Sequence, residues 1–255
     1  MTLLSVALAT LKGFSRDKIF HGTVVFSVAF ILFAYFLSTL TIVETRKILL
    51  DFGFTAISLS GIGIAIFTGL TCVGKEIETR TIYTVLAKPV SRTQYLFGKY
   101  LGAAAVVAIC HGILSLVLTA IASGVGEGLP AGMAACLFLI TLESLFVLAV
   151  AFVFSVVMSS SFLAATITLA VFLSGRASGT LVSVARKAES ELSRVLLQSL
   201  WSVVPNLERF NARDLVAYGK PLPEGMVLVS TGYFLFWVLL LLTITSIAFE
   251  RRDLP

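Results

Sequence analysis

Long runs of apolar residues alternate with short polar connections along nearly the whole chain. A helix that crosses a bilayer needs about 20 mostly apolar residues. The runs predict six transmembrane helices at about 23–43, 54–73, 100–123, 132–157, 159–175 and 227–249. The fifth run is short for a crossing and would cross either tilted or with local thinning of the bilayer. We therefore predict an all-α integral membrane protein with a single transmembrane domain over residues 1–255.

Basic residues at the ends of the apolar runs indicate the orientation of the chain. Cytoplasmic connections carry an excess of Lys and Arg. The N-terminal segment, the connection after the second run and the C-terminus are all basic, so we expect all three in the cytoplasm. The number of crossings is then even, which requires run 159–175 to cross. The connection 176–226 holds seven Lys and Arg and would lie outside, because long connections are translocated largely regardless of charge.

Two further segments show the period of an amphipathic helix. In residues 1–20, Leu4, Leu8 and Leu11 fall on one face, which predicts a helix along the membrane surface. The alternative there is a disordered basic tail. Residues 181–200 predict an outer amphipathic helix between spans five and six. That helix either forms a gate or partner surface or only caps the bundle.

Composition supports the membrane assignment. Of the 255 residues, 58% are hydrophobic and 13% are charged, against about 25% charged in a soluble domain. The formal net charge is +5, but the basic residues lie at the ends of apolar runs. This placement indicates contact with membrane lipid and excludes nucleic acid as a partner.

Residue patterns for catalysis or metal binding are missing from the sequence. It contains no G-x-x-x-x-G-K-[ST] loop for nucleotide phosphates and no HExxH motif. Its two histidines stand far apart, and its three cysteines form no CxxC pair. We expect no catalytic residue, no metal and no cofactor bound by this chain.

Two ionisable residues lie near the centres of apolar runs. Glu143 is in the fourth run and His111 in the third, on either side of the turn at Glu127. A carboxylate at this depth costs about 2.5–3.5 kcal/mol on insertion scales, so Glu143 should face protein or a wet cavity. We expect Glu143 and His111 to contact each other, either as a structural hydrogen bond or as a proton or substrate site.

Small residues at four-residue spacing occur in the second and third runs. Gly61, Ala65 and Gly69 follow this spacing in the second run, and Gly98 and Gly102 at the start of the third. Such spacing lets helices approach closely in lipid. It predicts a tightly packed bundle.

The connection between the second and third runs has the most distinctive sequence. From Gly74 to Gly102 it reads GKEIETRTIYTVLAKPVSRTQYLFGKYLG. Pro89 ends a short helix, and the four residues from Ser91 form a capping box for the next one. The pattern predicts a short helix that projects from the bilayer on the cytoplasmic side, with an ordinary solvated loop as the alternative.

This string resembles the cytoplasmic connection of type-2 ABC transporter permeases. In that family an acidic residue, a threonine-containing turn and a leucine precede P-[VI]-S-R and G-K. The matching positions are Glu76, Glu78, Thr81, Leu86, Pro89, Ser91, Arg92, Gly98 and Lys99. The stretch from Phe249 to Leu254 resembles the family's closing F-x-R-R-D-L, and Leu142-Glu143-Ser144 resembles the branch of copper-enzyme maturation permeases and multidrug-type exporters.

The resemblance implies the permease subunit of an ATP-binding-cassette exporter in the bacterial inner (plasma) membrane. Two permease copies, or one copy and a sister permease, would form the pathway. Two separate P-loop ATPase subunits would bind ATP and Mg²⁺ and engage the cytoplasmic coupling helix. The residues implied in ATPase coupling are Glu76, Glu78, Thr81, Leu86, Pro89, Ser91, Arg92 and Ser160.

Two other classes of function stay open from the residues themselves. The same bundle would serve a non-transporting membrane scaffold or assembly factor. An intramembrane enzyme would need clustered polar residues at one depth, and only Glu143 and His111 offer them. A P-loop ATPase partner separates the permease from both.

Overall fold

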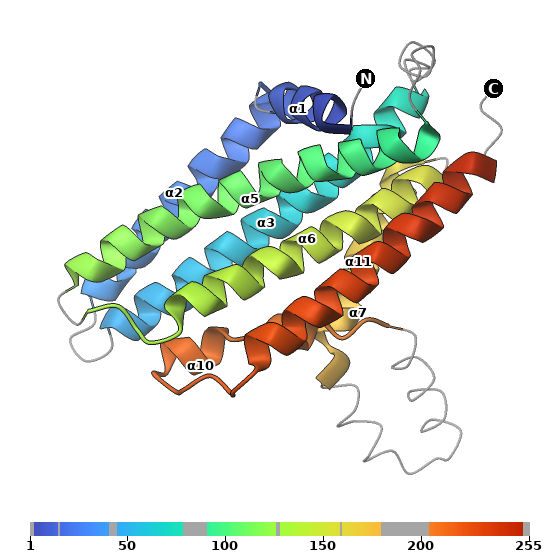
Figure 1. Cartoon of the computed structure of the whole chain (residues 1–255). Helices are drawn as coiled ribbons and strands as arrows, with labels where there is room; N and C mark the ends of the chain where they lie inside the picture. Colours follow the sequence, from blue (N-terminus) through green and yellow to red (C-terminus); the bar gives the residue numbers. More distant parts are fainter. Residues whose placement is uncertain are drawn as a thin grey trace.

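Uninterrupted apolar runs form the long helices of this chain, because helices satisfy every backbone hydrogen bond within lipid. The computed structural model describes residues 3–14, 16–40, 45–78, 91–125, 128–158, 160–179 and 204–251, and within them it contains no strand. The long helices run side by side in an elongated bundle (Figure 1). The predicted outer helix at 181–200 and most of the predicted coupling helix lie outside the described residues.

Five helices are long and apolar enough to cross a membrane. They correspond to the first four predicted spans and the last one. Their bounds are α2 (Lys18–Thr39), α3 (Thr45–Glu78), α5 (Arg92–Gly124), α6 (Met133–Val157) and α11 (Met226–Arg251). With 34 and 33 residues, α3 and α5 are each about 50 Å long and extend well beyond the bilayer core.

The fifth predicted span corresponds to a helix that is shorter than the others. α7 (Ser161–Arg176) has 16 residues, which gives about 24 Å against a hydrocarbon core of about 30 Å. Five of the six predicted spans are therefore confirmed as helices long enough to cross a membrane, and a crossing by the short run stays a prediction. Beyond α7, the short helices η1 (Leu207–Phe210) and α10 (Arg213–Ala217) pack among the long helices, with α10 against α3 and α6 and η1 against α6, α7 and α11.

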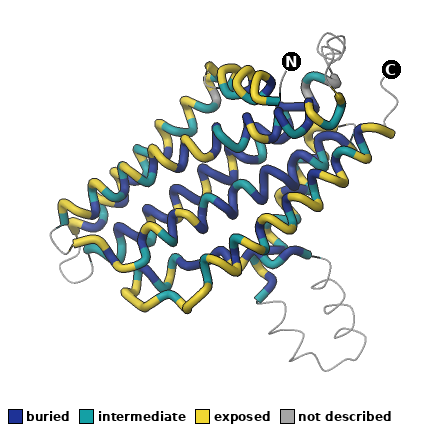
Figure 2. Tube along the Cα trace, viewed as in Figure 1, coloured by how far each residue is buried: buried dark blue, intermediate teal, exposed yellow. Residues whose placement is uncertain are grey.

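The two central helices are α3 and α6. Within their apolar windows, 72% and 67% of the residues are buried, against 17% in α2 and 22% in α11. Figure 2 shows the same contrast between the buried centre of the bundle and its exposed outer faces. The outer helices therefore offer apolar surface to lipid or to another subunit.

α1 (Leu3–Phe14) lies across one end of the bundle and packs on α5 (Figure 1). Its buried residues are Val6 and Thr10, while Leu4 and Leu8 are exposed. The helix that the sequence predicts here is therefore present, with an apolar outer face suited to the membrane surface. Both ends of the chain, the end of α3 and the start of α5 lie at this same end of the bundle (Figure 1).

Candidate functional site

Glu143 is completely buried on α6, and each oxygen of its carboxylate binds an arginine. Arg176, in the last turn of α7, donates from Nη1 to Oε1 at 2.8 Å. Arg213, on α10, donates from Nη2 to Oε2 at 2.6 Å, and the same nitrogen donates to Ser58 Oγ on α3 at 2.6 Å. This ionic cluster, defined by Glu143, Arg176 and Arg213, joins α6, α7 and α10 through one carboxylate, and Ser58 links it to α3.

The ionic cluster connects the end of α7 to α10. Arg176 is the last residue of α7, and Arg213 is the first residue of α10, in the segment that leads to α11. Arg176 also lies at a helix C-terminus, where the helix dipole favours a positive charge. The sequence pointed to Glu143 alone, because both arginines belong to polar stretches whose depth in the bundle hydropathy does not reveal.

His111 contacts Ser144 instead of Glu143. Its Nδ1 lies 2.9 Å from Val107 O, which can only accept, so Nδ1 carries a proton. Its Nε2 lies 3.2 Å from Ser144 Oγ. The expected Glu143–His111 contact is therefore corrected: both carboxylate oxygens bind guanidinium groups, which form stronger hydrogen bonds with a carboxylate than a neutral ring does.

Gly61 makes the close approach of α3 to this histidine possible. A Cβ atom at Gly61 would overlap the His111 ring and lie 2.6 Å from Ser144 Oγ. Farther along α3, a Cβ atom at Gly69 would lie 2.6 Å from Ala151 Cβ on α6. The predicted tight packing through small residues is thus confirmed for the second span.

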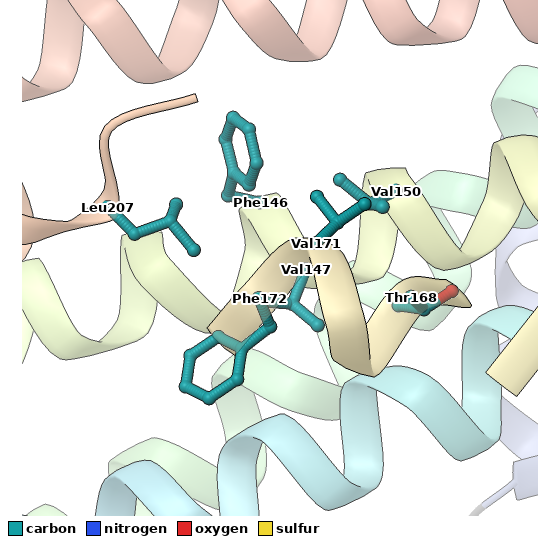
Figure 3. Close-up of a pocket in the computed structure, with 7 residues that line it drawn as sticks. All are labelled: Phe146, Val147, Val150, Thr168, Val171, Phe172 and Leu207. Carbon is teal, nitrogen blue, oxygen red and sulfur yellow. The ribbon is translucent and has the colours of Figure 1, made fainter. Parts of the chain in front are cut away.

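A narrow apolar crevice lies beside the ionic cluster, between α6 and α7 (Figure 3). Its lining residues are Phe146, Val147, Val150, Thr168, Val171, Phe172 and Leu207. The crevice leaves no space for a water molecule, so it offers no room for a substrate in this conformation.

At the other end of the bundle, α3 and α5 are tied together where the connection 79–90 leaves them. Glu76, in the last turn of α3, accepts a hydrogen bond from Tyr95 Oη on α5. Its other oxygen lies 2.5 Å from Lys99 Nζ. Ser91 caps α5 by accepting from Gln94 N at 3.2 Å, which confirms the predicted cap.

The first turns of α5 also hold the end of α11. Arg92 Nη1 lies 3.4 Å from the carbonyl oxygens of Phe249 and Glu250. The rings of Tyr95 and Phe249 stack with centroids 6.2 Å apart. We call this meeting of α3, α5 and α11 the helix junction, defined by Glu76, Arg92, Tyr95, Lys99 and Phe249. It brings together the two stretches of sequence that carry the family resemblance.

The predicted coupling residues are only partly described. Glu76 and Arg92 belong to the helix junction, and Ser160 caps α7 by accepting from Leu163 N at 3.5 Å. Outside the described residues lie Thr81, Leu86, Pro89 and the side chain of Glu78. A role of any of them in ATPase coupling stays a prediction. In the described part of the chain, no group of three His, Cys, Asp or Glu is placed to hold a metal ion.

Comparison with known protein families identifies the family of the chain. Residues 4–254 match the family described as ABC-2 family transporter protein. No curated protein matches the chain. The family match includes the ionic cluster and both stretches of sequence that meet at the helix junction. The chain therefore belongs to the ABC-2 family of transporters, in which it is a membrane-spanning permease component.

Proposed function

We propose that this chain is the permease subunit of an ATP-binding-cassette exporter and that separate ATPase subunits drive it. Membership of the ABC-2 family carries the proposal. The helix junction supports it, because the connection 79–90 leaves from two helices whose ends are joined through Glu76. A force applied to that connection reaches α3 and α5 together. ATP and Mg²⁺ bind to the partner, and this chain contributes no catalytic group.

A second permease copy, or a sister permease, completes the pathway in this proposal. The central helices α3 and α6 pack closely, and the crevice beside α7 has no space for a ligand. A pathway between two subunits avoids opening this packed interior. The short α7 favours the same arrangement, because a helix shorter than the bilayer is accommodated by association with another subunit.

The proposed location is the bacterial inner membrane, with both termini in the cytoplasm. Both termini lie at the end of the bundle where the connection 79–90 begins and ends (Figure 1). One ATPase subunit below each permease would therefore reach the coupling helix. It would also be close to the turn before Ser160, which follows the end of α6.

Purification of the tagged chain in mild detergent tests the ATPase partnership. We expect a P-loop ATPase to copurify in equal amount and to hydrolyse ATP. Changing Glu78, Thr81 and Leu86 together to alanine should release the ATPase, since these residues belong to the predicted coupling segment. Changing the exposed Lys220 and Glu224 to alanine, between α10 and α11, is the matched control and should retain it.

The alternative outcome separates the permease from a scaffold. Recovery of the chain alone, or with partners that hydrolyse no ATP, would reject the permease proposal. A triple variant that keeps its ATPase would reject the coupling segment while leaving the permease assignment in place.

Cross-linking between copies tests the second permease. Cys72, Cys110 and Cys136 are all buried, so a cysteine introduced on the surface is the main reactive thiol. Leu169→Cys on α7 should form disulfide-linked dimers, while Leu239→Cys on α11 should not; both leucines are exposed in the single chain. Dimers through α11 alone would place the partner against α11 and reject an interface through α7.

A further inference from the structure

Tyr95 belongs to α5 and contacts α3 and α11 at the end of the bundle that carries the coupling connection. It is completely buried in the second turn of α5. Its hydroxyl group donates to Glu76 on α3, and its ring stacks on Phe249 of α11 with an interplanar angle of 22°. Lys99, the second partner of Glu76, has its Nζ 5.6 Å from the centre of the Tyr95 ring.

Phe249 is the part of α11 that receives these contacts. It is completely buried, and the guanidinium carbon of Arg92 lies 5.9 Å from the centre of its ring. Elsewhere α11 packs chiefly on α6. Phe249 and the backbone carbonyls around it therefore connect the start of α5 to a helix that lies more than 150 residues later in the chain.

Different parts of the Tyr95 side chain thus make the two contacts. The hydroxyl group ties α5 to the end of α3, and the ring ties α5 to the end of α11. A tyrosine that only filled space at this position would not need a charged partner. The partly buried Glu76–Lys99 pair supplies that partner and fixes the direction of the hydroxyl group.

We propose that Tyr95 is a positioning residue that passes the movement of the coupling connection to α11. The inference rests on the proposed function and extends it, because it assigns a residue that does not contact the ATPase. When the ATPase displaces residues 79–90, α3 and α5 move together through the Glu76–Tyr95 hydrogen bond. The stacked rings of Tyr95 and Phe249 then carry α11 with them.

Two conservative variants remove the hydrogen bond and the ring stack one at a time in the purified permease–ATPase complex. Tyr95→Phe keeps the ring and removes the hydroxyl group, and Phe249→Leu keeps the hydroxyl bond and removes the stacked ring. Tyr35→Phe on α2 and Phe236→Leu on α11 are matched controls, because both side chains are exposed. All four variants should retain the ATPase in the same proportion as the unmodified chain.

The first measurement is the difference in ATP hydrolysis between the complex and the free ATPase. Residues within a coupling network change coupling by about two- to thirtyfold when substituted. Tyr95→Phe should reduce the permease-dependent part of hydrolysis within this range, and Tyr35→Phe should leave it unchanged. A Tyr95→Phe complex that hydrolyses ATP as the unmodified complex does would overturn the role of the hydroxyl group.

The second measurement follows α5 and α11 separately. Cysteines replace Gln94 on α5 and Ile247 on α11, both exposed, and maleimide labelling is compared between nucleotide-free and vanadate-trapped complexes. Trapping should change labelling at both positions in the unmodified background. With Phe249→Leu the change at position 247 should decrease while the change at position 94 persists, because only the bonds of Arg92 and Thr93 to α11 remain; Phe236→Leu should preserve both.

Three outcomes of the labelling experiment contradict the proposal. They are an unchanged position 247 in the unmodified complex, a response at 247 that Phe249→Leu leaves undiminished, and the loss of both responses together. Failure of the proposed function would be recognised separately, because the unmodified chain would then copurify with no ATPase before any variant is tested.

Discussion

Arg213 lies 2.6 Å from Glu143 although 70 positions separate them in the sequence and α10 stands between two spans. Glu143 is near the middle of α6, so the segment after α7 reaches deep into the bundle. Its backbone needs partners there, because lipid offers none. Tyr233 Oη accepts from Asn206 N at 2.8 Å, and Ser230 Oγ donates to Arg209 O at 3.0 Å. These bonds allow an irregular segment to occupy the space beyond the short α7.

Glu143→Gln tests whether this carboxylate holds the segment in place. The change leaves Arg176 and Arg213 close together without a negative charge. Breaking a buried ion pair by removing one partner costs about 3–5 kcal/mol. We expect a loss of this order, measured as a lower thermal unfolding temperature and a lower yield of monodisperse protein in detergent.

The two arginines provide the comparison for that prediction. Arg213→Gln leaves Glu143 paired with Arg176, and Arg176→Gln leaves it paired with Arg213. Arg176 is the more exposed of the two, with 27% of its side chain accessible against 12% for Arg213, so its loss should cost least. If Arg176→Gln lowered the unfolding temperature more than Arg213→Gln and Glu143→Gln, the carboxylate would not be the group on which the stability of the cluster depends.

Gly61→Ala should destabilise the bundle where α3, α5 and α6 meet. The added methyl group would overlap the His111 ring, and overpacking of a tight core costs about 1–3 kcal/mol. Gly63→Ala is the control, since nothing lies within 4 Å of a Cβ atom there. It should be neutral or slightly stabilising, because alanine favours helix by about 1 kcal/mol over glycine. Thermal unfolding of the two variants side by side measures the difference.

A double substitution identifies the cause of the Gly61 effect. His111→Ala removes the ring that the new methyl group would meet. The loss for Gly61→Ala together with His111→Ala should therefore be smaller than the sum of the two single losses. Additive losses would show that the methyl group is harmful for another reason.

Hydropathy was sufficient to predict the long helices because each contains an unbroken apolar run. It also identified Glu143 as a residue that must face protein. It could not supply the partners of Glu143. Arg176 and Arg213 lie in charged stretches that read as outer connections. The run 159–175 predicted the extent of α7, Ser161–Arg176, but no run of residues shows which side chains of a later segment pack beside the end of a helix.

The helix junction likewise contains contacts that the sequence could not predict. The capping residue Ser91 was predictable, because a cap depends on four neighbouring residues. The Tyr95–Phe249 stack was not, because its members come from opposite ends of the chain. Each belongs to a stretch with a family resemblance, yet a resemblance gives no contact between the two.

The native thiols should be inert in the folded protein. Cys72, Cys110 and Cys136 are buried, and none of them forms a disulfide. We expect no modification of the intact chain by a membrane-permeant maleimide, and modification of all three after denaturation in detergent. Mass spectrometry of the labelled chain counts the adducts. Rapid labelling of Cys110 before denaturation would show that the packing around this residue of α5 opens readily.

Gly102→Val should detach α1 from α5. A Cβ atom at Gly102 would lie 2.6 Å from Ala7 O and Thr10 Cβ, so a branched side chain cannot fit under α1. Lipid provides no hydrophobic force to keep the two helices together, and their contact depends on close packing. Gly112→Val, on the same helix, is the matched control because nothing lies within 4 Å of its Cβ position.

The rate of tryptic cleavage after Lys12 measures the detachment. An overpacking cost of about 1–3 kcal/mol raises the detached fraction of α1 by roughly five- to 150-fold. Cleavage of the Gly102→Val chain should accelerate accordingly, while Gly112→Val should be cleaved at the rate of the unmodified protein. If Gly102→Val were cleaved no faster, α1 would be held by the membrane surface alone, and the close approach at Gly102 would contribute nothing to its position.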